Sequence, residues 1–421
     1  MSKIDVHCHV FNKDVLTFSG KILIALGNIV TDLINHGNYN QAETMIERLD
    51  AFIELSRKDP AKITQALFDV YGNGAIIVPL MYDMYYLTHD LKKDFKEQLQ
   101  GFLKRFDYYD NPDRNQGEEI KNKVSRIGND TLGQIADEAF NHDCFDIQVE
   151  GMKALKEQFG DRVYPFMSFD PRRSGNLEAV KQYVGPGKPF HGVKLYPPLG
   201  FSAADESMMD QQNGLYAYCV ANDIPITAHC SCPGMPTMND HLYIRHNSWV
   251  FISDTGTPDD GDGECSKFNH GKLFRTSMDD TVDFSEGGSP QKSLYFNHPD
   301  IWQVVLEAFP SLRLNLAHFG GDCRDWRRRI ASMICSNTYQ NLYTDISCRT
   351  KDTELEGIRQ EYDGSEFIQR RLMYGSDFTI LLLSSDLPDF VSGVEEVFPS
   401  DKHRDIYWNN PRRFLKLPDP S

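Results

Sequence analysis

Eight short runs of β-branched or apolar residues alternate along this 421-residue chain with segments that have helical spacing. The runs cover residues 3–10, 75–82, 163–169, 191–196, 225–230, 313–319, 342–346 and 372–378. Between them, Leu177, Val180 and Val184 step by three and four residues, which is typical of a helix packed on a sheet. The alternation predicts an α/β fold with a parallel sheet, and the count of eight favours closure into a (β/α)8 TIM barrel over an open doubly wound sheet.

Three connections between the expected strands are longer than a simple crossover needs. They cover residues 11–74, 83–162 and 231–300, after the first, second and fifth strands. The first two have helical patterns, clearest at 42–55 and 91–106, whereas the third is rich in Gly, Asp, Asn and Pro and predicts an irregular loop. We therefore expect one barrel domain over residues 1–421 that carries three insertions.

The composition excludes several classes of partner. With 61 acidic against 44 basic residues, the net charge is −17, so nucleic-acid phosphates and anionic lipid repel the chain. The longest apolar stretch, 22–30, is far shorter than the roughly 20 residues of a membrane span. Nine scattered cysteines and the lack of a signal-peptide pattern predict reduced thiols and a cytoplasmic location. The expected partner is a small-molecule substrate, and the sequence is compatible with a homo-oligomer.

The first run carries two histidines near its end, in Asp5-Val6-His7-Cys8-His9. On a strand, side chains alternate between faces, so His7 and His9 are expected on one face and Cys8 on the other. Two imidazoles at a strand end suit the binding of a metal ion. A chance pair in an ordinary strand is the alternative.

Three later runs also end in a residue that can bind a metal. His229 ends the fifth, His318 the sixth and Asp377 the eighth. Since the C-terminal ends of barrel strands meet at one rim, we expect these three to join His7 and His9 there. A single histidine at such a place is more often a core residue, but five buried polar groups without partners would be costly, and a divalent metal removes that cost.

Lys194 interrupts the apolar fourth run, Gly192-Val193-Lys194-Leu195-Tyr196-Pro197. A lysine at such a position can pair with a buried carboxylate. Alternatively, because burial favours its neutral form, it can react with CO₂ to give a carbamate that bridges two metals.

With these residues, the chain resembles the amidohydrolase superfamily of metal-dependent (β/α)8 barrels. Two further segments, 169–173 (Phe-Asp-Pro-Arg-Arg) and 408–415 (Trp-Asn-Asn-Pro-Arg-Arg-Phe-Leu), are similar to the amidohydrolase-related branch, which includes aminocarboxymuconate-semialdehyde decarboxylase and related decarboxylases. The segment around Lys194 instead resembles the carbamylated-lysine strand of dihydroorotases.

The resemblance implies a centre of one or two divalent ions, and the imidazole-rich ligands favour zinc. A binuclear centre, which we expect, would use His7, His9, Lys194, His229, His318 and Asp377. A mononuclear centre would use His7, His9, His229 and Asp377, which leaves His318 to act on substrate or water.

The activity expected from these ligands is hydrolysis of a small amide, lactone or ester by metal-activated water. Asp377 would accept the water proton and pass it to the leaving group, with His318 as the second catalytic residue. Metal-dependent decarboxylation of a small carboxylic acid is the alternative. An inactive barrel that serves as a scaffold is a third, which the intact ligand set disfavours.

Three residues near the expected rim are candidates for substrate binding. Arg172 follows the third strand and Arg349 the seventh, and arginine suits bidentate binding of a carboxylate. Tyr196 lies two residues after Lys194, on the same face. A purely structural role is the alternative for each. Asp345 could orient a histidine, but we interpret it as an ordinary buried hydrogen-bonding aspartate.

Overall fold

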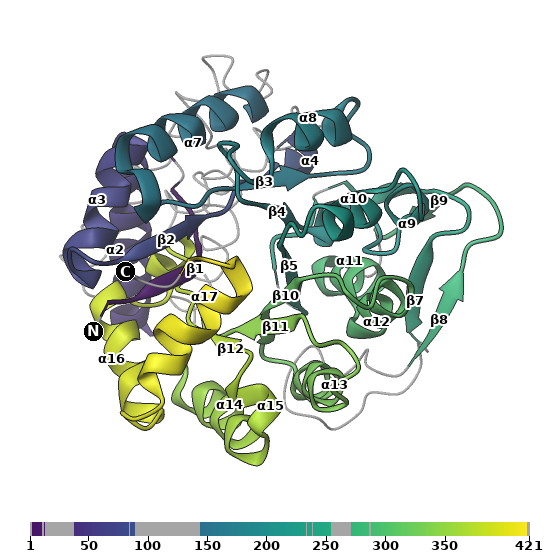
Figure 1. Ribbon diagram of the computed structural model, residues 1–421. Helices are drawn as coiled ribbons and strands as arrows, with labels where there is room; N and C mark the ends of the chain where they lie inside the picture. Colours follow the sequence, from purple (N-terminus) through teal and green to yellow (C-terminus); the bar gives the residue numbers. More distant parts are fainter. Residues whose placement is uncertain are drawn as a thin grey trace, which may run out of the picture.

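The computed structural model describes residues 2–10, 12, 38–83, 85–88, 144–232, 234–237, 239–253, 271–285 and 288–418. These residues form an α/β fold in which all eight expected strands are present (Figure 1). The strands are β1 (Ile4–Cys8), β2 (Ile76–Pro79), β3 (Phe166–Phe169), β4 (Gly192–Leu195), β5 (Ile226–Ser231), β10 (Leu314–Gly320), β11 (Leu342–Asp345) and β12 (Leu372–Met373).

The eight strands are parallel and follow one another in a ring. Six form a sheet in the order β12-β11-β10-β5-β4-β3, and β1 pairs with β2. A bridge between Leu80 and Phe166 joins β2 to β3. A bridge between Cys8 and Phe378 joins β1 to the segment after β12. The C-terminal ends of all eight strands therefore meet at one end of the ring.

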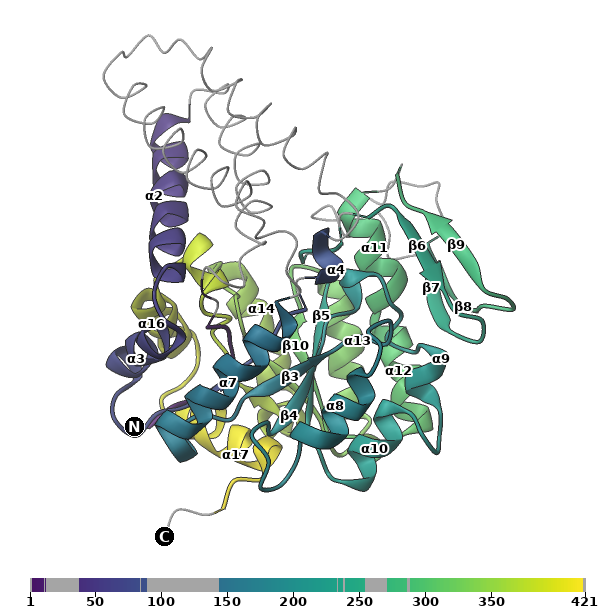
Figure 2. The ribbon, with the colours of Figure 1, turned by 90° about the horizontal axis from the view of Figure 1, so that it is seen from above.

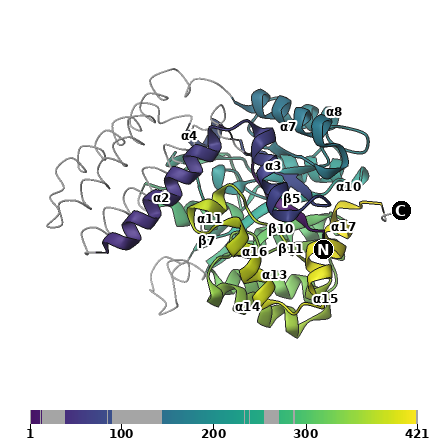
Figure 3. The same cartoon turned by 90° about the vertical axis from the view of Figure 1, so that its left-hand side faces the viewer.

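Helices surround this ring (Figure 1). The longer ones are α2 (Tyr39–Ser56), α3 (Pro60–Tyr71), α7 (Phe145–Phe159), α8 (Asn176–Tyr183), α10 (Leu215–Ala221), α11 (Gly288–Asn297), α12 (Pro299–Ala308), α13 (Arg324–Cys335), α14 (Asp352–Gly364), α16 (Leu387–Val397) and α17 (Asn410–Leu415). Short helices are α4 (Tyr85–Thr88), α9 (Glu206–Met209) and α15 (Glu366–Gln369). Figure 2 shows α17 at one end of the strands and α4 at the other, and α2 reaches outward in Figure 3.

Local sequence explains where several helices begin. Asp59 accepts a hydrogen bond from the backbone N–H of Ala61 at 2.8 Å, and Pro60 occupies the first turn of α3. His298 caps α12 in the same way, ahead of Pro299. Proline suits the first turn because the N–H that it lacks has no partner within the helix.

The prediction of an irregular loop over 231–300 is wrong in part. Within it, β6 (His241–Ile244) pairs with β9 (Asp280–Asp283), and β7 (Trp249–Ser253) pairs with β8 (Gly271–Arg275), both antiparallel. Leu242, Ile244, Val250, Phe284 and Phe296 form a small core of their own beneath these ribbons. For the other insertions, the helix expected at 42–55 is confirmed by α2, whereas the one at 91–106 lies outside the described residues.

Two further observations bear on the composition. None of the described helices is long and apolar enough to span a membrane. Cys232 is disulfide-bonded, so the expectation of reduced thiols is wrong for this residue. Seven other cysteines in the described ranges form no disulfide.

Candidate metal centre

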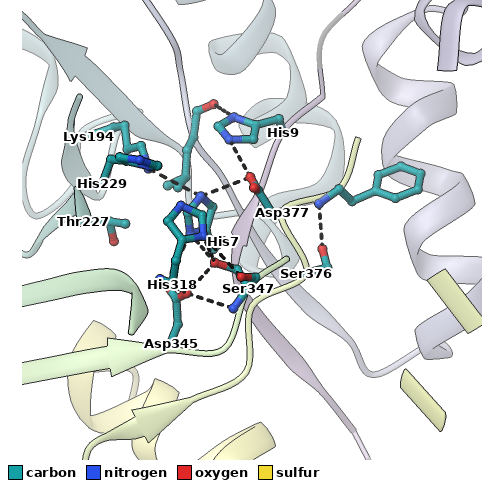
Figure 4. Close-up of polar contacts among 12 residues, drawn as sticks. His7, His9, Lys194, Thr227, His229, His318, Asp345, Ser347, Ser376 and Asp377 are labelled. Carbon is teal, nitrogen blue, oxygen red and sulfur yellow. Dashed lines mark hydrogen bonds and ion pairs between the residues drawn. The ribbon is translucent and has the colours of Figure 1, made fainter. Parts of the chain in front are cut away.

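The ends of four strands bring together the polar residues expected at the rim (Figure 4). His7 and His9 come from β1, His229 from β5, His318 from β10 and Asp377 from the segment after β12, and all five are buried. Oδ1 of Asp377 lies 3.3 Å from Nε2 of His7 and 3.1 Å from Nε2 of His9. The ring centroid of His318 is 4.8 Å from that of His7 and 4.7 Å from that of His229.

Backbone carbonyls fix the orientation of two of the imidazoles. Nδ1 of His9 lies 2.8 Å from the carbonyl oxygen of Leu80, and Nδ1 of His318 lies 3.2 Å from that of Ser347. A carbonyl oxygen can only accept a hydrogen bond, so each Nδ1 carries the proton. In the neutral ring, Nε2 is then the nitrogen with the lone pair, which is the usual arrangement of a metal-binding histidine.

Asp345 contacts Nδ1 of His7, whereas Asp377 lies near Nε2 of the same ring. The carboxylate of Asp345 lies 3.2 Å from Nδ1 of His7 and accepts hydrogen bonds from the side chain of Asn315 at 2.7 Å and the backbone N–H of His318 at 3.0 Å. Burial acts to raise the pKa of Asp345, but the neighbouring His7 and hydrogen bonds from His7 and Ser347 hold it well below its usual range. Asp345 is thus the buried, hydrogen-bonded aspartate that we expected, and its contact with His7 also makes it the orienting partner that was the alternative.

The charges at the cluster favour a cation. Burial and Lys194 act to lower the pKa of His7, yet Asp345 and Asp377 outweigh them and raise it. Burial acts to raise the pKa of Asp377, but His7, His9 and His318 keep it well below its usual range. Burial lowers the pKa of His318 to about 3, so this ring is neutral at physiological pH. Two carboxylates whose pKa values are lowered thus flank His7, an environment that attracts a cation.

The donor atoms present fit a divalent ion. His7, His318 and Asp377 each offer one ligand atom, and these atoms lie within 4.8 Å of one another. Imidazole nitrogen and carboxylate oxygen are the ligands of zinc and similar divalent metals. His9, in contact with Asp377, can complete the set.

Lys194 lies inside the cluster, with only 1% of its surface exposed. Its Nζ is 3.4 Å from Nε2 of His7. Burial lowers the pKa of Lys194 from 10.5 to about 8, and attraction by Asp377 and Asp345 offsets only part of that effect. The amine is therefore mainly protonated at pH 7, but a substantial fraction is neutral slightly above it.

A cavity of about 240 Å³ opens beside the cluster. Besides the cluster residues and Lys194, its walls include Tyr82, Tyr196, Met235, Arg349 and Ile380. Arg349 is 7% exposed and is held by ion pairs with Asp322 and, at 3.5 Å, with Glu354. The cavity thus combines an apolar and aromatic wall with two cationic side chains.

Comparison with known proteins agrees with this geometry. Residues 4–417 match the family model described as amidohydrolase. The chain belongs to the amidohydrolase family. The resemblance expected from the strand-end residues and the C-terminal segment is therefore confirmed, and with it a metal-dependent type of enzyme. No curated protein matches the sequence.

Solved structures show a distant likeness to this amidohydrolase. A 5-carboxyvanillate decarboxylase from Sphingomonas paucimobilis has 11% identity and a TM-score of 0.46, with 99% of each chain covered. A 2,6-dihydroxybenzoate decarboxylase has 13% identity and a TM-score of 0.43, with 99% of this chain and 100% of the other covered. An amidohydrolase from Burkholderia multivorans has 14% identity and a TM-score of 0.39, with 64% of this chain and 80% of the other covered.

The two candidate arginines lie in different surroundings. Arg349 lines the cavity, as does Tyr196, whereas Arg172 is not among the lining residues. The guanidinium of Arg172 pairs with Asp170 at 2.6 Å and donates to the carbonyl of Leu199 at 3.0 Å. Its hydrogen bonds are thus directed to the protein itself, which argues against the expected substrate contact.

The sequence did not indicate several residues of the cavity and of the histidine cluster beside it. Tyr82 ends the second expected strand, so the strand-end pattern could have found it. Gly234 and Met235 follow β5 within a long insertion and carry no local signal. Ser347, whose hydroxyl lies 3.0 Å from Nδ1 of His7 and 2.9 Å from Nδ1 of His318, was missed as well.

Proposed function

We propose that this member of the amidohydrolase family is a metal-dependent lyase that decarboxylates a small carboxylic acid. The observation that carries the proposal is one compact ligand set, His7, His318 and Asp377, beside a cavity with cationic Arg349 and Lys194. A protonated Lys194 at 3.4 Å from His7 disfavours a second divalent ion at that position, because like charges repel. The same ammonium attracts an anionic substrate. Decarboxylation, which was the alternative expected from the sequence, thus becomes the first candidate, and hydrolysis becomes the second.

The side chains of the cavity suit the loss of CO₂. A divalent ion held by His7, His9, His318 and Asp377 would act as a Lewis acid on a substrate oxygen. Arg349 binds the substrate through its guanidinium, which suits a carboxylate. The apolar surfaces of Met235 and Ile380 exclude water from the cavity, which strengthens the charged interactions inside it.

Lys194 is the proposed proton donor. When the bond between the substrate carbon and the carboxylate breaks, its electron pair stays on that carbon and CO₂ leaves. Nζ of Lys194 then transfers a proton to the carbon, which completes the exchange of the carboxyl group for hydrogen. A lysine with its pKa lowered to about 8 remains mainly charged at pH 7 yet gives up its proton more easily than an exposed one.

Hydrolysis of a small amide, lactone or ester is the second candidate. It is favoured by the place of Lys194, whose neutral form could take up CO₂ and give a bridging carbamate for two zinc ions next to His7, with His229 as a further ligand. In that reaction Asp377, ionised because its pKa lies far below neutrality, accepts the proton of the attacking water. Neutral His318 would assist Asp377 as the second catalytic residue.

Two measurements on the same preparation test these proposals. Mass spectrometry of protein purified without chelator gives the metal identity, zinc or another divalent ion, and the number of ions per chain. Carboxyl-labelled aromatic and unsaturated acids, and a set of lactones, esters and amides, are then assayed by ¹³C NMR. Release of labelled CO₂ with about one ion per chain is expected. Hydrolysis without CO₂ release, with two ions per chain, would replace the first candidate by the second.

A further inference from the structure

A short segment after β5, residues 234–237, forms one wall of the cavity; we refer to it as the β5 strap. Gly234 and Met235 of the strap both line the cavity. Met235 is half-buried and packs against the main hydrophobic core. Its side chain therefore limits the space that a substrate can occupy.

Two tyrosines hold the backbone of Met235 on both sides. The N–H of Met235 donates to the hydroxyl of Tyr196 at 2.7 Å, and its carbonyl accepts from the hydroxyl of Tyr82 at 3.0 Å. The two aromatic rings pack edge to face with centroids 4.5 Å apart. Because Tyr82 follows β2 and Tyr196 follows β4, the position of Met235 is set by the ring of strands itself.

The other end of the β5 strap is anchored separately. The N–H of Thr237 donates to the carbonyl of Pro198 at 2.9 Å, and its hydroxyl donates to the carbonyl of Tyr86 at 2.7 Å. Buried Lys292 donates to the carbonyl of Thr237 at 2.9 Å. A strap fixed at both ends cannot give way easily when a longer substrate enters.

Gly234 shows how closely the strap approaches the metal cluster. A Cβ atom at this position would lie 2.8 Å from Nε2 of His229 and 2.9 Å from the hydroxyl of Tyr196. Only a residue without a side chain therefore fits between the strap and the cluster.

Arg349 and the β5 strap reach the cavity from different parts of the ring of strands. Tyr82 and Tyr196, which hold Met235, follow the two neighbours of β3 in the ring, and β3 lies four strands away from β11 in either direction. Arg349 follows β11. Arg349 and Met235 thus both line the cavity, and they are held by different strands of the ring.

We propose that Met235 is a specificity-determining residue that sets the longest acid the cavity accepts, measured from the carboxylate bound at Arg349. The inference rests on the proposed function in so far as the substrate is an acid. Tyr82 and Tyr196 line the cavity themselves, and their hydrogen bonds to the backbone of Met235 fix the position of this residue.

The test uses benzoate and its 4-methyl, 4-ethyl and 4-propyl derivatives as probes, with the matching neutral benzyl alcohols. Dissociation constants for the metal-loaded full chain are measured by calorimetry. For the wild type, we expect the dissociation constant to rise at least tenfold between two successive members of the series. We call this rise the length step. In Met235→Ala the length step should occur at probes that are one or two carbons longer. Met209→Ala, a half-buried methionine of α9 outside the cavity lining, is the matched control and should leave the length step in place.

The outcomes separate this inference from the proposed function. An unchanged length step in Met235→Ala, in both probe series, overturns the role of Met235. If the acids bind no more tightly than the alcohols, the acid substrate is refuted, yet the length step in the alcohol series still tests Met235.

Discussion

Asp345 accepts a hydrogen bond from Nδ1 of His7 at 3.2 Å, across the strand β12 that separates their own strands in the ring. Both side chains are buried, with at most 1% of either residue exposed. The contact keeps Nε2 of His7 directed at Asp377, 3.3 Å away. An aspartate outside the ligand set therefore fixes the geometry of the set.

Replacement of this aspartate should weaken metal binding. In Asp345→Asn, one carboxylate oxygen becomes an N–H₂ group, which only donates, so the side chain can no longer accept from all the donors around it, among them Asn315 and the N–H of His318. We expect the metal affinity to fall about 10- to 100-fold. Competition with a chromophoric chelator measures the affinity, and circular dichroism checks the fold. Unchanged affinity in a folded variant would remove Asp345 from this role.

A glycine next to the cluster offers a second test of its packing. A Cβ atom at Gly375 would lie 2.7 Å from Cβ of His7 and 3.3 Å from Cβ of Ser347, so Gly375→Ala must displace one of them. We expect a loss of metal affinity of about tenfold or more. Gly151→Ala in α7, where nothing lies within 4 Å, is the control and should keep the affinity, with a gain in stability of up to about 1 kcal/mol. Equal affinities in both variants would contradict the prediction.

The strands and the centre could be predicted because their signals are local. An apolar run that ends in His229, His318 or Asp377 shows both a strand and the polar residue at its end. Parallel strands then bring these residues together, whatever the helices between them. The resemblance to a family rests on the same few positions.

The remaining features depend on contacts between distant segments. The ribbons of β6–β9 and β7–β8 form because Leu242, Val250 and Phe296 pack together, whereas the surrounding Gly and Asp residues indicate a loop. Similarly, the sequence around Arg172 does not show whether its guanidinium turns to the cavity or to Asp170. Such choices are decided by tertiary packing, which one sequence does not reveal.

The two arginines should respond differently to the same conservative change. Arg349→Lys keeps the charge but loses the planar fork that binds a carboxylate, so KM for an acid substrate should rise about tenfold with little change in kcat. Arg172→Lys should leave KM unchanged and lower the free energy of unfolding, by about 1–3 kcal/mol, because it breaks paired hydrogen bonds to Asp170. Steady-state kinetics and urea denaturation measure the two effects. A raised KM in Arg172→Lys alone would reverse the assignment.

Lys194 should make the stability of the metal-free protein depend on pH. Its pKa is lowered from 10.5 to about 8 by burial. Between these values the unfolded chain binds a proton that the native protein does not, so the free energy of unfolding rises with pH over this window. The full effect is on the order of 3 kcal/mol, reached near pH 10.5. Below pH 8 both states are protonated, and this contribution no longer changes with pH.

The variant Lys194→Met isolates this effect, because it keeps a long side chain but has no titrating group. Urea denaturation of both proteins is measured between pH 7 and pH 10.5, with a chelator to exclude metal and without dissolved CO₂ to exclude a carbamate. The stability of the wild type should rise relative to that of the variant across the window from pH 8 to pH 10.5. Parallel curves would mean that the amine keeps its ordinary pKa in the native protein, and its proposed role as a proton donor would then lose its physical basis.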